Sequence, residues 1–208
     1  MLHFEPSEYE GRLARTRAEM ARRGLDALLL FAPESQYWLT GYDTFGYCFF
    51  QCLIVSDRGP VLLTRSADLR QAELTSTVRD IRVWRDREGH DPTEDLVRLL
   101  RDLGLAGRRI GWETRTQGLV HAHGAALAVR LDGLVEASDL MGRLRLVKSP
   151  AEIACVRRAA ALADAAWEAG LAEIGPGAEE GRILAAMQGA VFEGGGDYAG
   201  NEIGRAHV

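Results

Sequence analysis

LVKSPAEI, at residues 146–153, is the stretch that decides how the chain is divided, because it opens a long helix. Ser149 is a favourable N-cap residue, and Pro150 suits the first helical position because its missing N–H would have no partner there. Glu152 follows Ser149 by three residues and completes a capping box. We therefore expect one folding unit to end at this point and another to begin at Ser149.

Two helices are expected in the second unit, residues 149–208. In the first helix, apolar residues recur at three- and four-residue steps and form a stripe that must bury against another part of the protein. The residues of this stripe are Ile153, Val156, Ala160, Ala163, Trp167 and Leu171. A turn at 175–177 precedes a second helix over 179–192. Its apolar stripe consists of Ile183, Leu184, Met187 and Val191. The glycines at 194–196 end this helix, and the residues after them have little pattern.

The first unit, residues 1–148, alternates expected helices and strands. Apolar spacing and capping residues predict helices over 6–23, 34–39, 67–74, from 91 to about 103, and over 116–131. Apolar and β-branched runs predict strands over 27–32, 47–55, 61–64, 81–84, 109–113 and 134–137. Because helices return between strands, we expect an α/β layer sandwich around a mixed sheet.

Composition excludes several classes of protein. The chain has 208 residues, of which 47% are hydrophobic and 26% charged, and a net charge of -5 without a basic stripe, which disfavours nucleic-acid binding. No apolar run is long enough to cross a membrane, and the first residues lack a signal pattern, so we expect a cytoplasmic location. Cys48, Cys52 and Cys155 have no CxxC spacing and are expected to be reduced, buried thiols, with Cys48 and Cys52 on one face of a strand.

Histidine and glycine patterns give no convincing site. His121 and His123 are two residues apart on an expected helix, so they point about 200° from each other and cannot chelate one ion. His3 and His90 have no neighbouring ligands in the sequence. The glycines at 194–196 do not lead from a strand into a helix, so they form no phosphate-binding fingerprint.

One loop combines aromatic side chains with a carboxylate between two glycines. Its residues Tyr42, Asp43, Phe45 and Tyr47 are candidates for a small-molecule pocket or a dimer contact. The alternative is that these aromatic side chains simply cover the edge of the sheet.

Three motifs occur in the order found in one known family. They are the pattern of residues 9–29, YWLTGY at 37–42, and VKSPAEI at 147–153. With these motifs the chain resembles the creatinase/prolidase family of pita-bread metallohydrolases over nearly its whole length. The resemblance implies that residues 1–148 form a creatinase-like N-terminal domain and that 149–208 form the first helices of an incomplete pita-bread catalytic domain.

The resemblance also carries expectations about activity. Residues 41–52 look most like the ectoine hydrolase branch, whose enzymes open the cyclic amidine of a compatible solute at a C–N bond. The broader family cleaves Xaa-Pro peptides or related C–N bonds. The resemblance further implies a homodimer, in which the N-terminal domain of one subunit helps to wall the partner's active site, and a small-molecule or dipeptide substrate.

Metal ligands are the part of the family pattern that this chain does not match. The family uses two divalent ions (Mn, Co, Zn or Fe), held by two Asp, one His and two Glu on strands beyond the second catalytic-domain helix. Here the conceivable late ligands are Asp164, exposed on a helix, and Asp197, Glu202 and His207, which we interpret as a solvated tail. We expect no metal ligand and no catalytic residue in this chain.

Two functional hypotheses follow. In the first, the chain is the N-terminal part of a dimeric metal-dependent C–N hydrolase, of the ectoine hydrolase or Xaa-Pro peptidase type, and is inactive by itself. In the second, it is a stand-alone, non-catalytic binding or dimerisation module with the creatinase-type fold. A longer reading frame that supplies the five metal ligands would support the first hypothesis.

Overall fold

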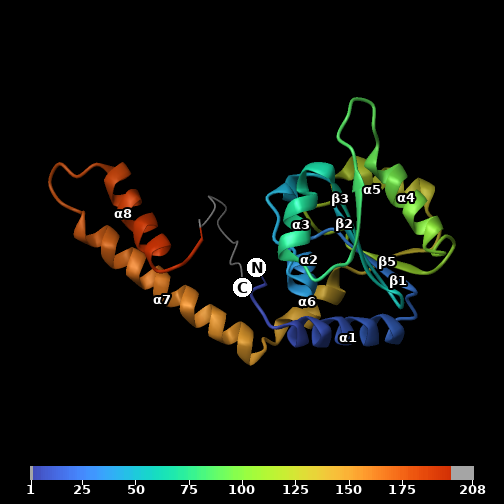
Figure 1. The fold of residues 1–208 in the computed structure, drawn as a ribbon, viewed down its shortest axis with the longest axis horizontal. Coiled ribbons are helices and arrows are strands. Elements are labelled where there is room, and N and C mark those ends of the chain that lie inside the picture. Colours follow the sequence, from blue (N-terminus) through green and yellow to red (C-terminus); the bar gives the residue numbers. More distant parts are fainter. Residues whose placement is uncertain (1, 198–208) are drawn as a thin grey trace. The chain divides into compact units, whose positions relative to one another are not determined.

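A computed structural model describes residues 2–197, and the chain forms two compact units, Met1–Leu146 and Val147–Val208 (Figure 1). The first unit contains a six-stranded sheet with the order β4-β3-β2-β1-β5-β6. Its strands are β1 (Ala27–Leu30), β2 (Cys52–Ser56), β3 (Gly59–Arg65), β4 (Asp80–Trp84), β5 (Ile110–Trp112) and β6 (Leu134–Glu136). The expected α/β fold with a mixed sheet is confirmed.

Strand β1 lies at the centre of this sheet, antiparallel to β2 and parallel to β5. All four of its residues are fully buried, as the continuous apolar run predicts for a strand covered on both faces. Strands β2 and β3 form the expected hairpin, in which Val55 pairs with Pro60. The remaining pairs, β3 with β4 and β5 with β6, are parallel.

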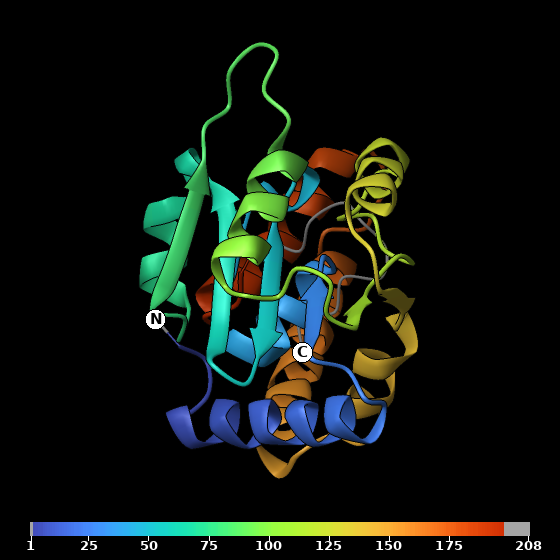
Figure 2. The same ribbon diagram turned by 90° about the vertical axis from the view of Figure 1, so that its right-hand side faces the viewer.

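Helices cover both faces of the sheet. Leu96 and Leu100 of α4 (Pro92–Asp102) and Leu127 of α5 (His121–Arg130) belong to the core of one face, and Figure 2 shows α4 in front of the strands. The other face is covered by four helices, α1 (Pro6–Arg22), α2 (Pro33–Thr40), α3 (Leu69–Thr75) and α6 (Ser138–Leu146). The first unit is therefore a three-layer α/β/α structure.

Three segments of the first unit differ from the sequence prediction. The strand predicted over 47–55 begins only at Cys52, and the 3₁₀-helix η1 (Gly46–Cys48) precedes it because side chains bond the backbone of this turn. The helix predicted from residue 116 begins at His121, since the Thr116 hydroxyl accepts the N–H of Gly118 in a local turn. Helix α6 has no counterpart in the prediction.

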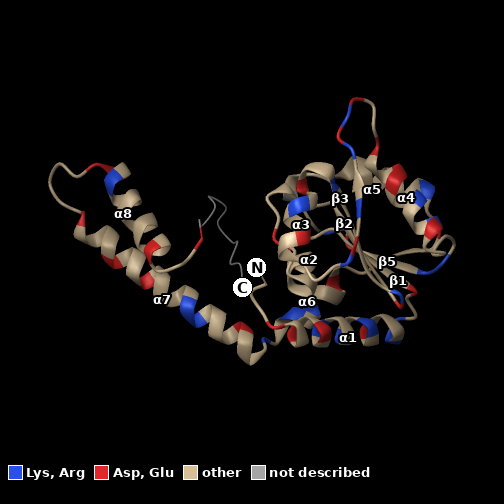
Figure 3. Ribbon diagram, in the orientation of Figure 1, with Lys and Arg blue, Asp and Glu red and all other residues tan. Residues whose placement is uncertain are grey.

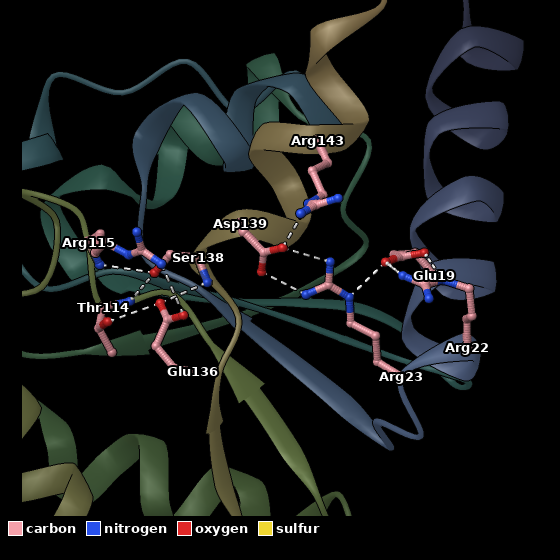
Figure 4. A network of polar contacts seen from close by, with 9 residues as sticks. All are labelled: Glu19, Arg22, Arg23, Thr114, Arg115, Glu136, Ser138, Asp139 and Arg143. Atoms are coloured by element: carbon pink, nitrogen blue, oxygen red, sulfur yellow. Dashed lines mark hydrogen bonds and ion pairs between the residues drawn. The ribbon is translucent and has the colours of Figure 1, made fainter.

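Ion pairs hold α6 against the rest of the first unit (Figure 4). Arg23, just after α1, donates from its two terminal nitrogens to the carboxylate of Asp139, at 2.7 and 3.0 Å. Arg143, one helical turn further along α6, donates to the same carboxylate at 3.0 Å. The hydrogen bond from Arg23 lowers the pKa of Asp139 to about 2. The contacts between Arg23 and Asp139 join segments that are more than 100 residues apart in the sequence.

Replacing Asp139 with Asn is expected to lower the free energy of unfolding by about 1 kcal/mol, because partly exposed ion pairs contribute little individually and more in a network. Because the folded pKa of Asp139 lies below its ordinary value of 3.8, the contribution is present above that pH and is lost as the pH falls towards 2. Urea denaturation at pH 7 measures the change. Asp132→Asn, at an exposed position, is the matched control, and an equal loss in both variants would contradict the role of the network.

The second unit consists of α7 (Pro150–Ala172) and α8 (Glu180–Glu193). The predicted capping box is present, since Ser149 and Glu152 each bond the other's backbone N–H. The two helices approach closely at Gly170, where an added Cβ would lie 2.8 Å from the side chain of Met187.

Much of the apolar stripe expected to bury on α7 is exposed within this unit. Trp167 is 62% exposed, and Ile153, Val156 and Leu171 are exposed as well. Leu184 and Phe192 on α8 are also exposed. Within the described residues nothing buries this stripe, which agrees with the prediction that both helices carry exposed apolar stripes where no sheet covers them.

Charges of both signs are interspersed over the described helices, and α1 alone carries several acids and several arginines (Figure 3). Within residues 2–197, no helix combines the length and the apolar composition that a membrane-crossing segment requires.

Candidate functional site

Residues 42–50, which we call the aromatic loop, follow α2 and contain the residues singled out in the sequence. Gly41 ends the helix in the left-handed conformation, with a φ of 80°. A Cβ at this position would lie 2.9 Å from the Thr75 carbonyl oxygen and from the Tyr9 hydroxyl. Only glycine fits both the conformation and the space, so the start of the loop is fixed.

The carboxylate of Glu113, which follows β5, fixes the start of α2. One carboxylate oxygen accepts the N–H groups of Phe31 and Ala32 at 3.0 and 2.9 Å, and the other accepts the Ser35 hydroxyl at 2.6 Å. Burial raises the pKa of Glu113 to about 7, although these three hydrogen bonds favour the ionised form. The buried carboxyl group therefore connects the sheet to the helix that leads into the aromatic loop.

The first two residues of the loop are tied to the fold. Tyr42 is buried in the core, and its hydroxyl lies 3.0 Å from the hydroxyl of Thr64 on β3. This burial raises the pKa of Tyr42. Asp43 is held through its backbone, because its N–H donates to the Thr75 hydroxyl at 3.2 Å and its carbonyl accepts from the same hydroxyl at 3.4 Å. The Asp43 side chain itself is half-buried.

The turn of the loop closes around Gln51. The amide nitrogen of this buried side chain donates to the carbonyl of Gly46 and, at 3.3 Å, to the hydroxyl of Thr44. The Thr44 hydroxyl also accepts the N–H of Gly46 at 2.8 Å. A Cβ at Gly46 would lie 2.5 Å from a carboxylate oxygen of Asp68 and 2.7 Å from the Gln51 amide nitrogen. The turn therefore requires glycine at this position.

The outer part of the loop presents apolar side chains to solvent. Phe45 is 85% exposed, and Cys48 and Phe49 are exposed as well. The guanidinium of Arg65 lies 3.5 Å from the centre of the Phe49 ring and donates to Asp68 at 3.2 Å. The outer part of the loop is thus an exposed apolar surface, in which Arg65 holds the ring of Phe49.

The structure places the four sequence candidates differently. Tyr42 is a core residue, Asp43 is half-buried, Phe45 is exposed, and the side chain of Tyr47 lies outside what the structure describes. Their role as a pocket or dimer contact stays a prediction. Sequence reasoning missed the residues that support the loop, namely Phe49, Gln51, Arg65 and Asp68. Phe49 and Arg65 are distant in the sequence and meet only in the fold, whereas Gln51 is five residues from Gly46 but was assigned to the predicted strand.

Cysteine and histidine predictions are partly corrected. Cys52 is buried as expected, but Cys48 is exposed on η1 and Cys155 is half-buried. Because Cys48 lies on η1 and Cys52 on β2, these two cysteines do not share a strand face. His90 does have a neighbour, because Asp95 bonds its ring nitrogen. His123 packs edge-on against the Phe50 ring. Core packing thus accounts for His123.

The late candidate ligands fall only partly within the described residues. Asp164 is exposed on α7 as expected, whereas Glu202 and His207 lie outside the described residues. Among residues 2–197, no three His, Cys, Asp or Glu side chains are gathered so that they could hold a metal ion. The described residues therefore do not fit the two-metal centre that the family resemblance implies.

The family described as Creatinase/Prolidase N-terminal domain matches residues 12–147. The chain belongs to this family. Among curated relatives, the ectoine hydrolase of Halomonas elongata is 29% identical over 95% of this chain and 54% of its own length. An uncharacterised hydrolase/peptidase, y4tM of Sinorhizobium fredii, is 26% identical over 96% of this chain and 54% of its own length. This creatinase/prolidase chain therefore spans about half the length of the curated relatives it matches.

Solved structures show the same fold. The Xaa-Pro dipeptidase from Bacillus anthracis matches 89% of this chain with 49% of its own, at a TM-score of 0.70 and 22% identity. The dipeptidase PepE from Mycobacterium ulcerans matches 92% of this chain with 51% of its own, at a TM-score of 0.69 and 24% identity. As in the curated relatives, about half of each creatinase/prolidase-type structure corresponds to this chain.

Proposed function

We propose that the chain is the N-terminal part of a dimeric, metal-dependent hydrolase that cleaves C–N bonds in ectoine-like amidines or Xaa-Pro dipeptides. The observation that carries the proposal is the match of nearly the whole chain to about half of an ectoine hydrolase, centred on the creatinase/prolidase N-terminal domain. In this proposal the catalytic metal ions are bound by residues outside this sequence, and we assign no catalytic step to the described residues.

The exposed apolar residues of the second unit support the proposal. Trp167 and Leu171 on α7, and Leu184 and Phe192 on α8, are all about half exposed or more. Apolar side chains that gather on a surface mark contacts with further protein. We infer that the remainder of a pita-bread catalytic domain packs on these two helices.

The aromatic loop has a defined role in this proposal. Its outer residues, Phe45 and Phe49, would contact the active site of the partner subunit. There they would form an apolar wall that excludes water from that site. Hydrogen bonds from Gln51 and the Arg65 guanidinium hold the loop before any partner binds, so little conformational entropy is lost on assembly.

The proposal is tested with the protein extended by the reading frame that follows residue 208. We expect it to hydrolyse ectoine or an Xaa-Pro dipeptide in the presence of manganese or cobalt, and to lose this activity with a chelator. We expect the 208-residue chain to be inactive under the same conditions. A stop codon directly after residue 208 would instead favour a non-catalytic binding or dimerisation module, and activity of the 208-residue chain would contradict the proposal.

A further inference from the structure

A cleft of about 450 Å³ lies in the first unit, on a different set of elements from the aromatic loop. Its walls come from the last turns of α1, the turn between β2 and β3, and the connection from α4 to β5. Three arginines line it, Arg17, Arg58 and Arg108, one from each of these segments. Nothing in the proposed hydrolase function uses this cleft.

Arg17 is held in position without an acidic partner. Its Nε–H donates to the carbonyl of Ser56 at 3.0 Å, and one terminal nitrogen donates to the carbonyl of Asp57 at 3.4 Å. Among the residues that the structure describes, no carboxylate pairs with this half-buried guanidinium. The hydrogen bonds fix its orientation, and its positive charge is left without a direct counter-ion.

Arg58 and Arg108 add charge that is also unpaired. Both side chains are exposed, and neither forms a hydrogen bond or ion pair with any other residue in the described part of the chain. Other arginines of the first unit, such as Arg22 and Arg23, do pair with carboxylates. The two free side chains are therefore able to turn towards a ligand in the cleft.

The acids that line the cleft do not cancel this charge. Asp26 and Asp57 face three arginines, and Asp26 already accepts the N–H of Arg109 at 2.9 Å. The floor of the cleft is apolar, because Met20, Leu25 and Leu105 are buried there. A ligand that suits these walls carries one oxyanion for the arginines and an apolar body for the floor.

We propose that this cleft binds a small molecule that joins a carboxylate or phosphate group to an apolar body, with Arg17, Arg58 and Arg108 contacting the oxyanion. Guanidinium groups bind both carboxylate and phosphate in a bidentate manner, so the arginines select an oxyanion but do not distinguish between these two kinds. This binding site is separate from the proposed hydrolase function, and the proposal does not depend on that function.

The test follows the Arg17 Nε–H signal of the ¹⁵N-labelled 208-residue protein by NMR. Benzoate and phenyl phosphate supply the two oxyanions on the same apolar ring, and benzyl alcohol supplies the ring without a charge. We expect a saturable shift with at least one of the anions, at a Kd on the order of 1 mM or lower, and no saturation with benzyl alcohol. The anion that binds more tightly identifies the source of the oxyanion.

The double variant Arg58→Ser, Arg108→Ser is expected to weaken binding of that anion by about tenfold or more, because it removes two charge-assisted contacts. Both residues are exposed, so the fold does not depend on them. Arg70→Ser, at an exposed arginine of α3 that does not line the cleft, is the matched control and should bind like the unmodified chain. Absence of a saturable shift, equal binding of benzyl alcohol, or an equal loss in the control would overturn the proposal.

Discussion

Raising the pH from 5 to 8 is expected to destabilise the first unit through Glu113 by up to about 3 kcal/mol. Burial raises the pKa of this carboxyl group from its ordinary value of 4.5 to about 7 in the folded state. Between these values the folded chain binds more protons than the unfolded chain, so stability falls as the pH rises. The pKa is raised because the desolvation free energy of the buried carboxylate exceeds the stabilisation that its three hydrogen bonds give to the ionised form.

The measurement is urea unfolding at several pH values, for the unmodified chain and for Glu113→Gln. The amide keeps an oxygen for the N–H groups of Phe31 and Ala32 but does not titrate, so its stability should depend less on pH over this range. The comparison is needed because burial lowers the pKa of His123, which acts in the opposite direction. Identical pH dependence in the two proteins would contradict the role of Glu113.

Glu113→Ala is expected to lower the free energy of unfolding by about 3 kcal/mol or more at pH 5, since it leaves buried donors without an acceptor. Phe31, Ala32 and Ser35 would all lose their partner. The glutamine variant serves as the control for this loss, because it fills the same space and keeps an acceptor. A stability equal to that of the glutamine variant would show that the three hydrogen bonds contribute little.

Phe45→Ala in the extended protein is expected to reduce kcat/KM by about tenfold or more, the equivalent of losing the burial of one aromatic side chain in the substrate complex. The side chain is 85% exposed in the first unit, so its removal should leave the folded state of that unit unchanged. Steady-state kinetics on the preferred substrate and a thermal melt measure the two quantities separately.

Val129→Ala is the matched control, because Val129 is 89% exposed on α5, which covers the opposite face of the sheet from α2 and the start of the loop. We expect this variant to keep both its activity and its melting temperature. If the two variants lose activity equally, or if Phe45→Ala loses none, the aromatic loop is not part of an active site.

The sequence predicted the elements whose signals are local. The capping box of Ser149 and Glu152 needs only four adjacent residues, and the run from Ala27 to Leu30 defines a doubly covered strand by its own composition. Helix α6 was missed although it also carries local signals, since Leu140, Met141 and Leu144 recur at helical spacing and pack in the core. The pairing of its Asp139 with Arg23 is distant in the sequence, and local propensity carries no information about such a contact.

The candidate site shows the same division. The glycines and aromatic residues of the loop marked it in the sequence, but the residues that hold its shape did not stand out. Gln51 was read as part of a strand, although its side chain closes the turn at Gly46. The stacking of Arg65 on Phe49 requires β3 and the loop to be adjacent, which only the folded sheet provides. Burial of Tyr42 likewise depends on the core around β3.

Subunit mixing tests most directly whether this chain completes the active site of a partner. The extended protein is prepared in two forms, one with Phe45→Ala and one with its metal ligands replaced, and the two are unfolded, mixed equally and refolded. Random pairing with a loop that acts across the dimer predicts recovery of about a quarter of the unmodified activity. A mixture no more active than the average of the two separate preparations would contradict the account.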